Sequence, residues 1–531
     1  MGAGAVASGL AVANPAFATG GTPANSTTTV PPAVTIGPTD PRYADLQLRN
    51  WNKLYKATPE SFRIVRNAAQ VAQAVADAVS ANKRIAIRSG GHGLDGLVED
   101  TAMQIIIDFS EMRAITYDTA RNAFCIEPGA TLGQIYRSLD LGWEVTLPAG
   151  LCPAVGAGGH IIGGGAGALS RQHGLVSDHL YAVEVVTVNA AGAVVTTIAT
   201  RETNDPNREL WWAHAGGGGG NFGVVTRFWM RSPGPVPTSA ATALPKRPGA
   251  LMTGRAIWNW SAMDQVSFIQ LLKNYGVWHE ANSAPGQAGN QLYASLIAPR
   301  KEAGRVIVSA QVDPTVQGNE QLLNNFLTTL TTNVTPHANL INTGRQPWQY
   351  TTVNATDTAV AMGVQGPPRS RTKGALLIKR YTDDQAATIH QYLTSTTYSH
   401  SASSFSISSY GGQINAASGS AIAAAHRSAV MLASVFSCWD VAADDSRHLT
   451  WNREFYQALH ADTGGYPTPN ARYDGLFLNW PDTDVLDPTW NTSPVQWPAL
   501  YHKGNYTRLR QAKAVWDPRN IFRHKLSVQL P

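Results

Sequence analysis

The sequence predicts an α+β protein built from two main parts, and the pattern along the chain supports this in two ways. Residues 43–233 alternate short β-rich runs with helical runs and contain dense glycine clusters, which is typical of mixed sheet and helix. Residues 235–475 contain fewer glycines and more Thr, Ser, Asn and aromatic residues. We therefore expect a glycine-rich ligand-binding domain, followed by a domain with an antiparallel sheet covered by helices.

Composition and charge narrow the class of protein. The 531 residues leave room for two to four domains at roughly 100–200 residues each. The net charge of +5 is spread without a basic block, which argues against a nucleic-acid partner. The sequence has no run of roughly 18 or more apolar residues, which argues against a membrane-spanning helix. The cysteines, Cys125, Cys152 and Cys438, form no C-x-x-C pair, so neither a zinc site nor a disulfide framework is indicated.

The first residues suggest export. Residues 1–18 carry no charge and end in Ala16-Phe17-Ala18, the small-x-small form of a signal cleavage site. The positive charge usual at the start of a signal is missing, so either the numbered start lies inside a longer precursor that uses a twin-arginine route, or these residues form an Ala/Gly tail. The Thr-, Pro- and Gly-rich composition of residues 19–38 is typical of a linker. The expected boundaries are 1–40, 41–235, 236–480 and 481–531.

Hydrophobic spacing predicts individual elements in both parts. A helix is expected wherever apolar residues recur at helical spacing, and a strand wherever β-rich runs are short. The pattern predicts helices over 71–79, 383–393 and 501–517, and strands over 84–88, 123–127, 224–229 and 375–380. The last helix is basic and should end before Pro518, because proline cannot continue a helix.

Glycine clusters are the most informative local feature. Gly90-Gly91, residues 156–167 and residues 216–220 allow backbone to approach a ligand where a Cβ would clash, which suggests a long cofactor laid across backbone. Gly218-x-Gly220-x-x-Gly223 matches the dinucleotide-binding pattern, but a strand rather than a helix follows it, so a Rossmann nicotinamide site is not expected. A P-loop motif is also missing from the sequence.

Several motifs, taken in order, resemble those of the berberine bridge enzyme-like flavoprotein oxidases. They are Arg88-Ser-Gly-Gly-His92, Pro148-Ala-Gly-Leu-Cys-Pro-Ala-Val-Gly-Ala-Gly-Gly-His160, and the segments 163–178, 210–226 and 516–522. Within that family the chain is most similar to the actinobacterial group that acts on antibiotics, including glycopeptide hexose oxidases. The resemblance implies a PCMH-type FAD-binding domain, of the vanillyl-alcohol oxidase type, whose flavin half is closed by the C-terminal segment.

The resemblance also implies that FAD is attached twice. His92 would bond the flavin 8α-methyl carbon and Cys152 would bond flavin C6, and a neutral imidazole or a thiolate can add to an electrophilic oxidised ring. The alternative is that His92 is a turn histidine bonded to backbone and that Cys152 is a small buried hydrophobe. Cys125 and Cys438 are expected in the core.

Backbone amides should hold the charged part of the cofactor. The N–H groups of Ser89, Gly90 and Gly91 would form an anion-binding nest for the pyrophosphate. His160 would lie near the flavin or would only hydrogen-bond backbone. By resemblance the other cofactor contacts are Arg88, Gly150, Gly156, Gly158, Gly159, Gly163, Gly164, Gly167, Asn479 and, on the adenine side, Val225.

The expected catalytic base is missing. Oxidation of an aliphatic alcohol needs a base for the hydroxyl proton, which the family often supplies as a tyrosine in Tyr-x-Asn-Tyr-x-Asp. This chain reads Phe477-Leu-Asn479-Trp480-Pro-Asp482, so both phenols are absent. Tyr473, Tyr381 or Asp482 would then serve as the base, or the substrate would need no strong base, as with an amine or with a hydroquinone that ionises near pKa ~10.

The sequence therefore predicts an exported FAD-dependent oxidase of a bulky secondary metabolite, which passes hydride to flavin N5 and then electrons to O2 to give H2O2. A mitosane-like hydroquinone or amine, in biosynthesis or self-resistance, is the expected substrate, and Trp480, Tyr410 and Trp348 would stack it unless they are ordinary core residues. The alternatives are a hexose or alcohol oxidase acting on a glycosylated antibiotic, and a flavoprotein without turnover that binds the metabolite or scaffolds a cyclisation. No metal is expected, and the protein would be a monomer or dimer.

Overall fold

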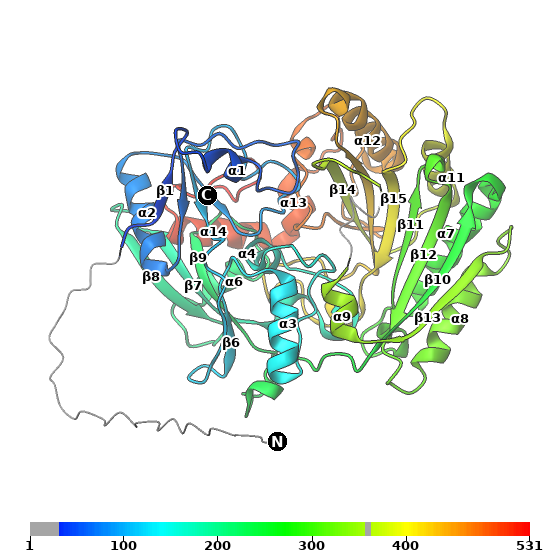
Figure 1. The fold of residues 1–531 in the computed structure, drawn as a ribbon, viewed down its shortest axis with the longest axis horizontal. Helices are drawn as coiled ribbons and strands as arrows, with labels where there is room; N and C mark the ends of the chain where they lie inside the picture. The colour runs from blue at the N-terminus through cyan, green and yellow to red at the C-terminus, as the bar shows by residue number, and fades with distance from the viewer. Residues whose placement is uncertain (1–30, 356–362) are drawn as a thin grey trace, which may run out of the picture. The chain divides into compact units, whose positions relative to one another are not determined.

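The computed structural model describes residues 31–355 and 363–531, of which residues 32–531 form one compact unit. This unit contains a four-stranded, a five-stranded and an eight-stranded sheet, with helices between and beside them (Figure 1). The predicted α+β class is confirmed. The predicted signal at 1–18 lies outside the described residues, and the predicted boundaries at 40, 235 and 480 stay predictions.

The four-stranded sheet has the order β1-β2-β4-β3. Its central strands pair in parallel, while β1 pairs antiparallel with β2, so part of the expected linker at 19–38 is in fact an ordered strand. The predicted helix over 71–79 and the predicted strand over 84–88 are both present. The elements are β1 (Val34–Ile36), α1 (Tyr43–Gln47), β2 (Ser61–Ile64), α2 (Ala68–Ser80), β3 (Ile85–Arg88) and β4 (Ile105–Asp108).

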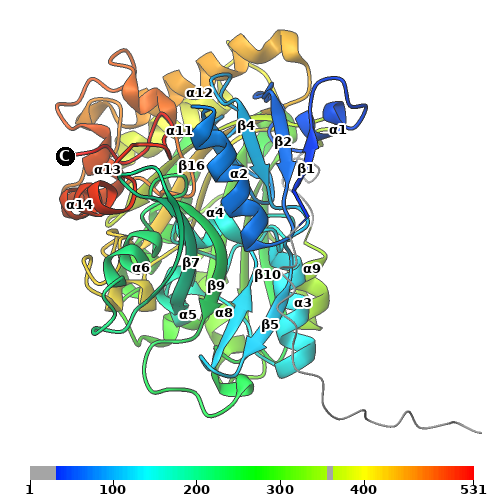
Figure 2. The same cartoon turned by 90° about the vertical axis from the view of Figure 1, so that its left-hand side faces the viewer.

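The five-stranded sheet is antiparallel and has the order β5-β6-β9-β7-β8. Helix α2 packs between the two smaller sheets (Figure 2), with Val71 and Val75 in one core with Val186 and Val224. A strand follows the glycine run at 216–220, as predicted. The strands are β5 (Ile115–Asp118), β6 (Ala123–Ile126), β7 (Leu180–Val188), β8 (Val194–Thr200) and β9 (Val224–Met230), and the helices are α3 (Leu132–Trp143), α4 (Ala157–Ile162), α5 (Ser170–His173) and α6 (Arg208–His214).

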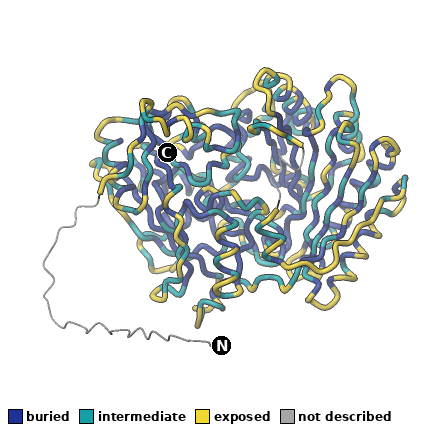
Figure 3. Tube along the Cα trace, in the orientation of Figure 1, coloured by how far each residue is buried: buried dark blue, intermediate teal, exposed yellow. Residues whose placement is uncertain are grey.

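The eight-stranded sheet is antiparallel, with the order β13-β10-β12-β11-β15-β16-β14-β17. Helices α7 (Gln265–Ala281), α8 (Asn319–Thr331), α11 (Asp383–Thr394) and α12 (Asp445–Leu459) cover one face (Figure 1). The edge strand β13 is exposed along its whole length (Figure 3). The strands are β10 (Leu251–Asn259), β11 (Tyr293–Pro299), β12 (Arg305–Val312), β13 (Asn339–Gln346), β14 (Arg369–Leu377), β15 (Ser403–Ser409), β16 (Met431–Trp439) and β17 (Tyr473–Gly475), and α9 spans Trp348–Val353.

Alternation along these strands separates two faces. Val306, Val308 and Ala310 of β12 are buried in the core under the helices, so the residues between them face the other way. Among residues 31–355 and 363–531, no helix covers this second face, which borders a large cavity. The strand predicted at 375–380 begins earlier and ends at Leu377, whereas the predicted helix at 383–393 is α11.

The C-terminal segment returns to the glycine-rich part. The single helix predicted over 501–517 is two helices, α13 (Trp497–His502) and α14 (Tyr506–Trp516), separated at Lys503, whose φ is +50°. Buried Lys513 donates to the carbonyl of Asn221 at 2.6 Å and pairs with Asp517 at 2.6 Å. This anchors α14 directly behind the glycine run. Among the described residues, no helix is both long and apolar enough to span a membrane.

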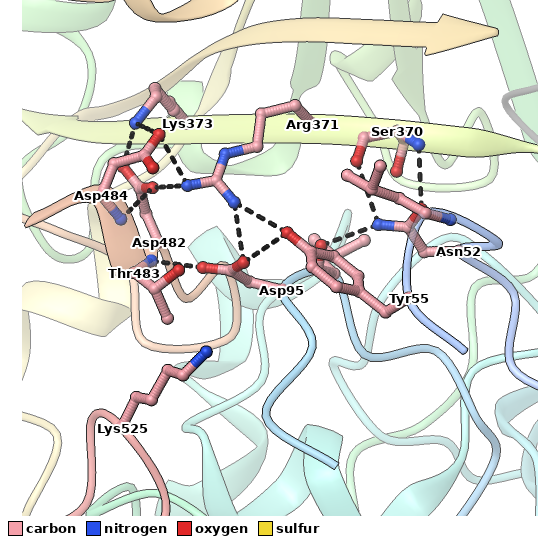
Figure 4. A network of polar contacts seen from close by, with 12 residues as sticks. Asn52, Tyr55, Asp95, Ser370, Arg371, Lys373, Asp482, Thr483, Asp484 and Lys525 are labelled. Atoms are coloured by element: carbon pink, nitrogen blue, oxygen red, sulfur yellow. Dashed lines mark hydrogen bonds and ion pairs between the residues drawn. The ribbon is translucent and has the colours of Figure 1, made fainter. Parts of the chain in front are cut away.

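A buried cluster of charges joins the eight-stranded sheet to the loop after β3 (Figure 4). The Arg371 guanidinium lies 2.7 Å from Asp95 and 2.8 Å from Asp484, and it also contacts Asp482. Lys373 lies 2.7 Å from Asp482 and 2.8 Å from Asp484. Burial would lower the pKa of Arg371, but the three carboxylates outweigh it and raise that pKa. Arg371 therefore stays charged and ties three separate chain segments together.

Polar neighbours satisfy the remaining oxygens of this cluster. The Tyr55 hydroxyl donates to Asp95 at 2.6 Å, and the Tyr466 hydroxyl donates to Asp482 at 2.7 Å. The amide of Asn52 bridges the same segments, since its side chain accepts from the backbone nitrogen of Ser370 at 2.9 Å. A buried ion pair stabilises only when such additional hydrogen bonds are present.

Replacing Arg371 by Met should lower the free energy of unfolding by about 3–5 kcal/mol, because buried carboxylates then lose their cation. Urea unfolding, followed by tryptophan fluorescence, measures the change. Arg66→Met, at an exposed position, is the control and should change little. A variant R371M as stable as the unchanged protein would contradict the importance of this cluster.

Candidate active site

One cavity of about 1310 Å³ lies between the glycine-rich loops and the uncovered face of the eight-stranded sheet. Pockets for a single drug-sized ligand usually measure about 300–1,000 Å³, so this cavity has room for a cofactor and a second molecule. The loop after β3 and the segment around α4 line one side. Strands β10, β11, β12, β15 and β16 line the other.

Two backbone segments meet without side chains between them at the cavity wall. A Cβ added at Gly90 would lie 2.3 Å from the backbone nitrogen of Gly156, and a Cβ added at Gly156 would lie 2.2 Å from that of Gly90. The Ser89 hydroxyl donates to the Pro128 carbonyl at 2.5 Å and accepts from the Gly158 nitrogen at 3.3 Å. Only glycine allows this approach, which fixes the loop after β3 against the start of α4.

The amides of this loop fit an anionic ligand. Within the described residues, no hydrogen bond is found from the backbone N–H groups of Ser89, Gly90 or Gly91 to another protein group. Gly91 has a φ of +75°, a conformation that directs successive N–H groups to one point. The predicted nest for a pyrophosphate therefore agrees with the geometry.

His92 and Cys152 line the same cavity. The imidazole of His92 stacks on Trp51, with ring centroids 6.1 Å apart and an interplanar angle of 20°, and Cys152 is half-buried. The structure thus brings together the two side chains expected to bond the flavin. Cys438 is buried as expected, and burial raises the pKa of half-buried Cys125 to about 11.

Most of the predicted cofactor contacts also border the cavity. Gly164 does not: it lies near Ala424 and Leu175 with a φ of +107°, so its role is in the turn after α4. Arg88 pairs with Asp108 at 2.7 Å and holds the end of β3, while its second terminal nitrogen, Nη2, has no hydrogen-bond partner. The predicted residues that line the cavity are Arg88, Ser89, Gly90, Gly91, Gly150, Gly156, Gly158, Gly159, Gly163, Gly167 and Val225.

His160 borders the cavity and also hydrogen-bonds backbone, and its place near the flavin stays a prediction. Its Nε2 accepts a hydrogen bond from the Gly150 nitrogen at 3.1 Å, and the ring borders the cavity. Burial lowers the pKa of His160 to about 4. The ring is therefore neutral near pH 7 with its proton on Nδ1, so it orients the loop that precedes Cys152 and is not charged as an acid.

Asn479 fastens the C-terminal segment to the same loops. Its Oδ1 accepts from the Gly165 nitrogen at 2.9 Å, and its Nδ2 donates to the carbonyls of Gly159 and His160, each at 3.2 Å. A Cβ at Gly163 would lie 2.3 Å from that Nδ2. Both N–H groups and the oxygen of this amide hold backbone, which makes Asn479 a positioning residue.

Phe477 and Trp480 occupy the two motif positions at which the family often has tyrosines. Trp480 packs on Phe477, with centroids 5.5 Å apart, and Phe477 packs on Tyr410 at 6.4 Å. Trp480 and Tyr410 line the cavity, as expected for a stacking wall. Trp348 does not: it packs on Tyr136 in the core of the glycine-rich part.

The three candidates for the base are placed elsewhere. Tyr381 and Tyr473 lie in the core between the large sheet and its helices, where Tyr381 reaches His460 at 3.3 Å and Tyr473 accepts from Gln385 at 2.5 Å. Asp482 belongs to the cluster around Arg371. None of the three borders the cavity, because each side chain points to the opposite side of the sheet or into the buried cluster.

Sequence reasoning missed several cavity groups. Tyr293 lies in the wall with Tyr410, and burial raises the pKa of both phenols. Glu99 is another group at the cavity that was not predicted. Its side chain is buried, with 5% exposure, and burial raises its pKa to about 7. The alternating serines of residues 403–409 were a visible signal, since on a strand they place hydroxyls on one face.

Comparison with known proteins agrees with this site. The FAD binding domain family matches residues 59–198, and the family described as berberine and berberine like matches residues 476–529. Aclacinomycin-N/aclacinomycin-A oxidase from Streptomyces galilaeus is 44% identical over 501 residues, covering 94% of this chain and 90% of the relative.

Two solved structures are similar over 94% of this chain and all of theirs. One is CrmK, a flavoenzyme involved in shunt product recycling in caerulomycin biosynthesis, with 41% identity and a TM-score of 0.91. The other is a glycopeptide hexose oxidase complexed with teicoplanin, with 40% identity and a TM-score of 0.89. Matches in sequence, family models and fold agree, and this chain belongs to the berberine bridge enzyme-like family of FAD-dependent oxidases.

Proposed function

We propose that this protein oxidises a bulky natural product, with FAD attached through both His92 and Cys152 and with O2 as electron acceptor. The observation that carries the proposal is the cavity of about 1310 Å³ that is lined both by these two side chains and by the open side of a large sheet. The similarity to oxidases and a flavoenzyme of natural-product metabolism supports the same activity. Export of the protein is part of the proposal and rests on residues 16–18.

FAD, when bound, supplies a hydride acceptor at N5 and passes the electrons to O2, which yields H2O2. The residues present fit this cofactor. Ser89, Gly90 and Gly91 would offer amides for the pyrophosphate, Val225 lines the cavity and would contact the adenine, and Trp51 stacks on the ring of His92. Asn479 holds the backbone of the α4 loop against the C-terminal segment and would keep that segment next to the cofactor.

The reacting group of the substrate has two candidates. A hydroquinone, phenol or amine needs no strong base, which suits the replacement of both family phenols by Phe477 and Trp480. A sugar hydroxyl does need one, and Tyr410, which lines the cavity and contacts Phe477, is a phenol beside that motif. The serine-lined sheet favours this second candidate, because hydroxyl groups hydrogen-bond a sugar.

Mixing the anaerobic holoenzyme with glycosylated and hydroquinone-type metabolites tests the function. An oxidase should lose its oxidised flavin absorbance on mixing, and admitting air should restore it with one H2O2 per substrate oxidised. Spectral perturbation without bleaching across the whole set would indicate a flavoprotein that only binds its guest, and would refute the proposed oxidation.

Gly159→Ala should reduce the FAD content of the purified protein without harming its fold. A Cβ at Gly159 meets no atom within 4 Å and enters the cavity, so it competes with the cofactor only. Gly142→Ala is the matched control: its Cβ also meets nothing within 4 Å, but Gly142 is exposed on α3. Flavin absorbance per protein and melting temperature give the two readings, and a fully loaded G159A variant would place the cofactor elsewhere.

The two covalent bonds predict how flavin behaves after acid precipitation. His92→Ala or Cys152→Ala alone should leave yellow protein, because one bond remains, whereas the double variant should release all flavin into the supernatant. Cys125→Ala serves as the control, since Cys125 does not border the cavity. Peptide mass mapping identifies the modified residues, and unmodified peptides at both positions in fresh protein would contradict the double attachment.

A further inference from the structure

The open face of the eight-stranded sheet has an ordered pattern of side chains, of which the proposed function uses only the serines. Across the strands, one row runs from Gly374 through Ser434, Ser406, Ile297 and Ile307 to Ile257. All members of this row other than Gly374 border the cavity. Trp480 packs at the glycine end, where its ring carbon would lie 2.9 Å from a Cβ of Gly374. The row therefore begins beside Trp480 and leads away from it.

Hydroxyl groups occupy the part of the wall near Trp480. Ser406 and Ser434 lie 2.8 Å apart, and Ser408 donates to Ser295 at 3.1 Å. Each hydroxyl has one donor and two acceptor lone pairs, so these pairs keep hydrogen-bonding capacity toward the cavity. This end suits a hydroxylated group.

The far part of the row is apolar. Ile257, Ile297 and Ile307 are neighbours on adjacent strands and face the cavity. Ile297 is 39% exposed, although it sits in the interior of the sheet. These side chains form a surface that a flat apolar body would cover.

Two cations flank this apolar surface. Arg255 stands opposite Ser309, two positions to one side of Ile257, and Arg305 stands opposite Asn259, two positions to the other side. Both are exposed and border the cavity, and neither forms an ion pair or side-chain hydrogen bond within the described part of the chain. The carboxylates that border the cavity in that part are Asp95 and Glu99, on the loop after His92.

We propose that this wall binds an elongated guest with a hydroxylated reacting end at Ser406 and Ser434, an apolar body on the isoleucines, and a carboxylate held by Arg255 and Arg305. Neighbouring strands lie about 4.8 Å apart, and β12 and β10 lie on average three strand spacings from the strands β15 and β16 that carry these serines, so the carboxylate lies about 14 Å from the reacting end. The inference rests on the proposed function only in taking the flavin side as the reacting end. It narrows the substrate class to hydroxylated or glycosylated aromatic acids.

Anaerobic titration of the holoenzyme with two probes tests the inference. The probes are a terphenyl glucoside with a carboxylate at the far end and its methyl ester, and the flavin absorbance change reports binding. The probe with the carboxylate should bind about tenfold more tightly than its methyl ester. This difference is expected for hydrogen bonds between charged groups that solvent partly screens. Added salt should weaken only the carboxylate.

Variants then assign the effect to the two arginines. Arg255→Gln and Arg305→Gln should each weaken carboxylate binding about three- to fivefold and leave ester binding unchanged, and the double variant should bind both probes alike. Arg66→Gln, at an exposed position away from the cavity, should change neither. Equal affinities of both probes for the unchanged protein, no binding of either, or full preference for the carboxylate in the double variant would overturn the inference.

This experiment is independent of turnover. If the carboxylate binds as expected but no flavin bleaching follows with any candidate substrate, the proposed oxidation fails while the binding wall stands. If bleaching and H2O2 occur with neutral substrates only, and the carboxylate shows no preference, the oxidase stands and the anionic class is wrong.

Discussion

The meeting of Gly90 with Gly156 is the constraint on which the site depends. At this point two backbones touch with no room for a Cβ, so the loop after β3 and the start of α4 cannot move independently. His92 follows one glycine and Cys152 precedes the other, and their side chains reach one cavity as a consequence. Conformational freedom lost at glycine costs more than at other residues, so this arrangement needs support from elsewhere in the fold.

Charges buried away from the cavity provide that support. Asp95 lies three residues after His92, and Asp482 lies two residues after Trp480; Arg371 of β14 contacts both. One strand of the large sheet therefore sets the position of the cofactor loop and of the aromatic motif together. Gly374 lies on the same strand and packs against Trp480. The register of β14 therefore also sets the distance from Trp480 to Ser434 and Ser406.

Local motifs were sufficient to predict which glycine-rich loops meet at one cavity. The spacing of Ser89, Gly90, Gly91 and His92 determines a loop conformation whose cause lies within a few residues, and the structure places that loop at the cavity. The substrate side depends on which face of a sheet meets the helices. Tyr381 and Tyr473 were expected at the site, but they pack under the helices, and nothing near them in sequence reveals this.

Long-range pairing explains the other differences. The predicted strand at 375–380 leaves out the first half of β14, which contains Arg371 and Lys373. Their partner carboxylates come from segments more than a hundred residues away in sequence, and without knowing those contacts the charges argue against burial. The same contacts remove Asp482 from the set of groups that could act as a base.

The electrostatics of the cavity follow from burial rather than from the number of basic residues. His160, His214 and His524 border the cavity, and burial lowers the pKa of each to about 4, so these rings are neutral near pH 7 and use their nitrogens to hold backbone. His214 donates to the Leu210 carbonyl at 2.8 Å, and the His524 ring lies 3.0 Å from the Gly219 carbonyl. In the proposals above, backbone amides would meet an anionic cofactor at one end, and Arg255 and Arg305 would meet the carboxylate of the substrate at the sheet end. Cofactor binding and substrate choice would then use different parts of the chain, which would allow one to change without the other.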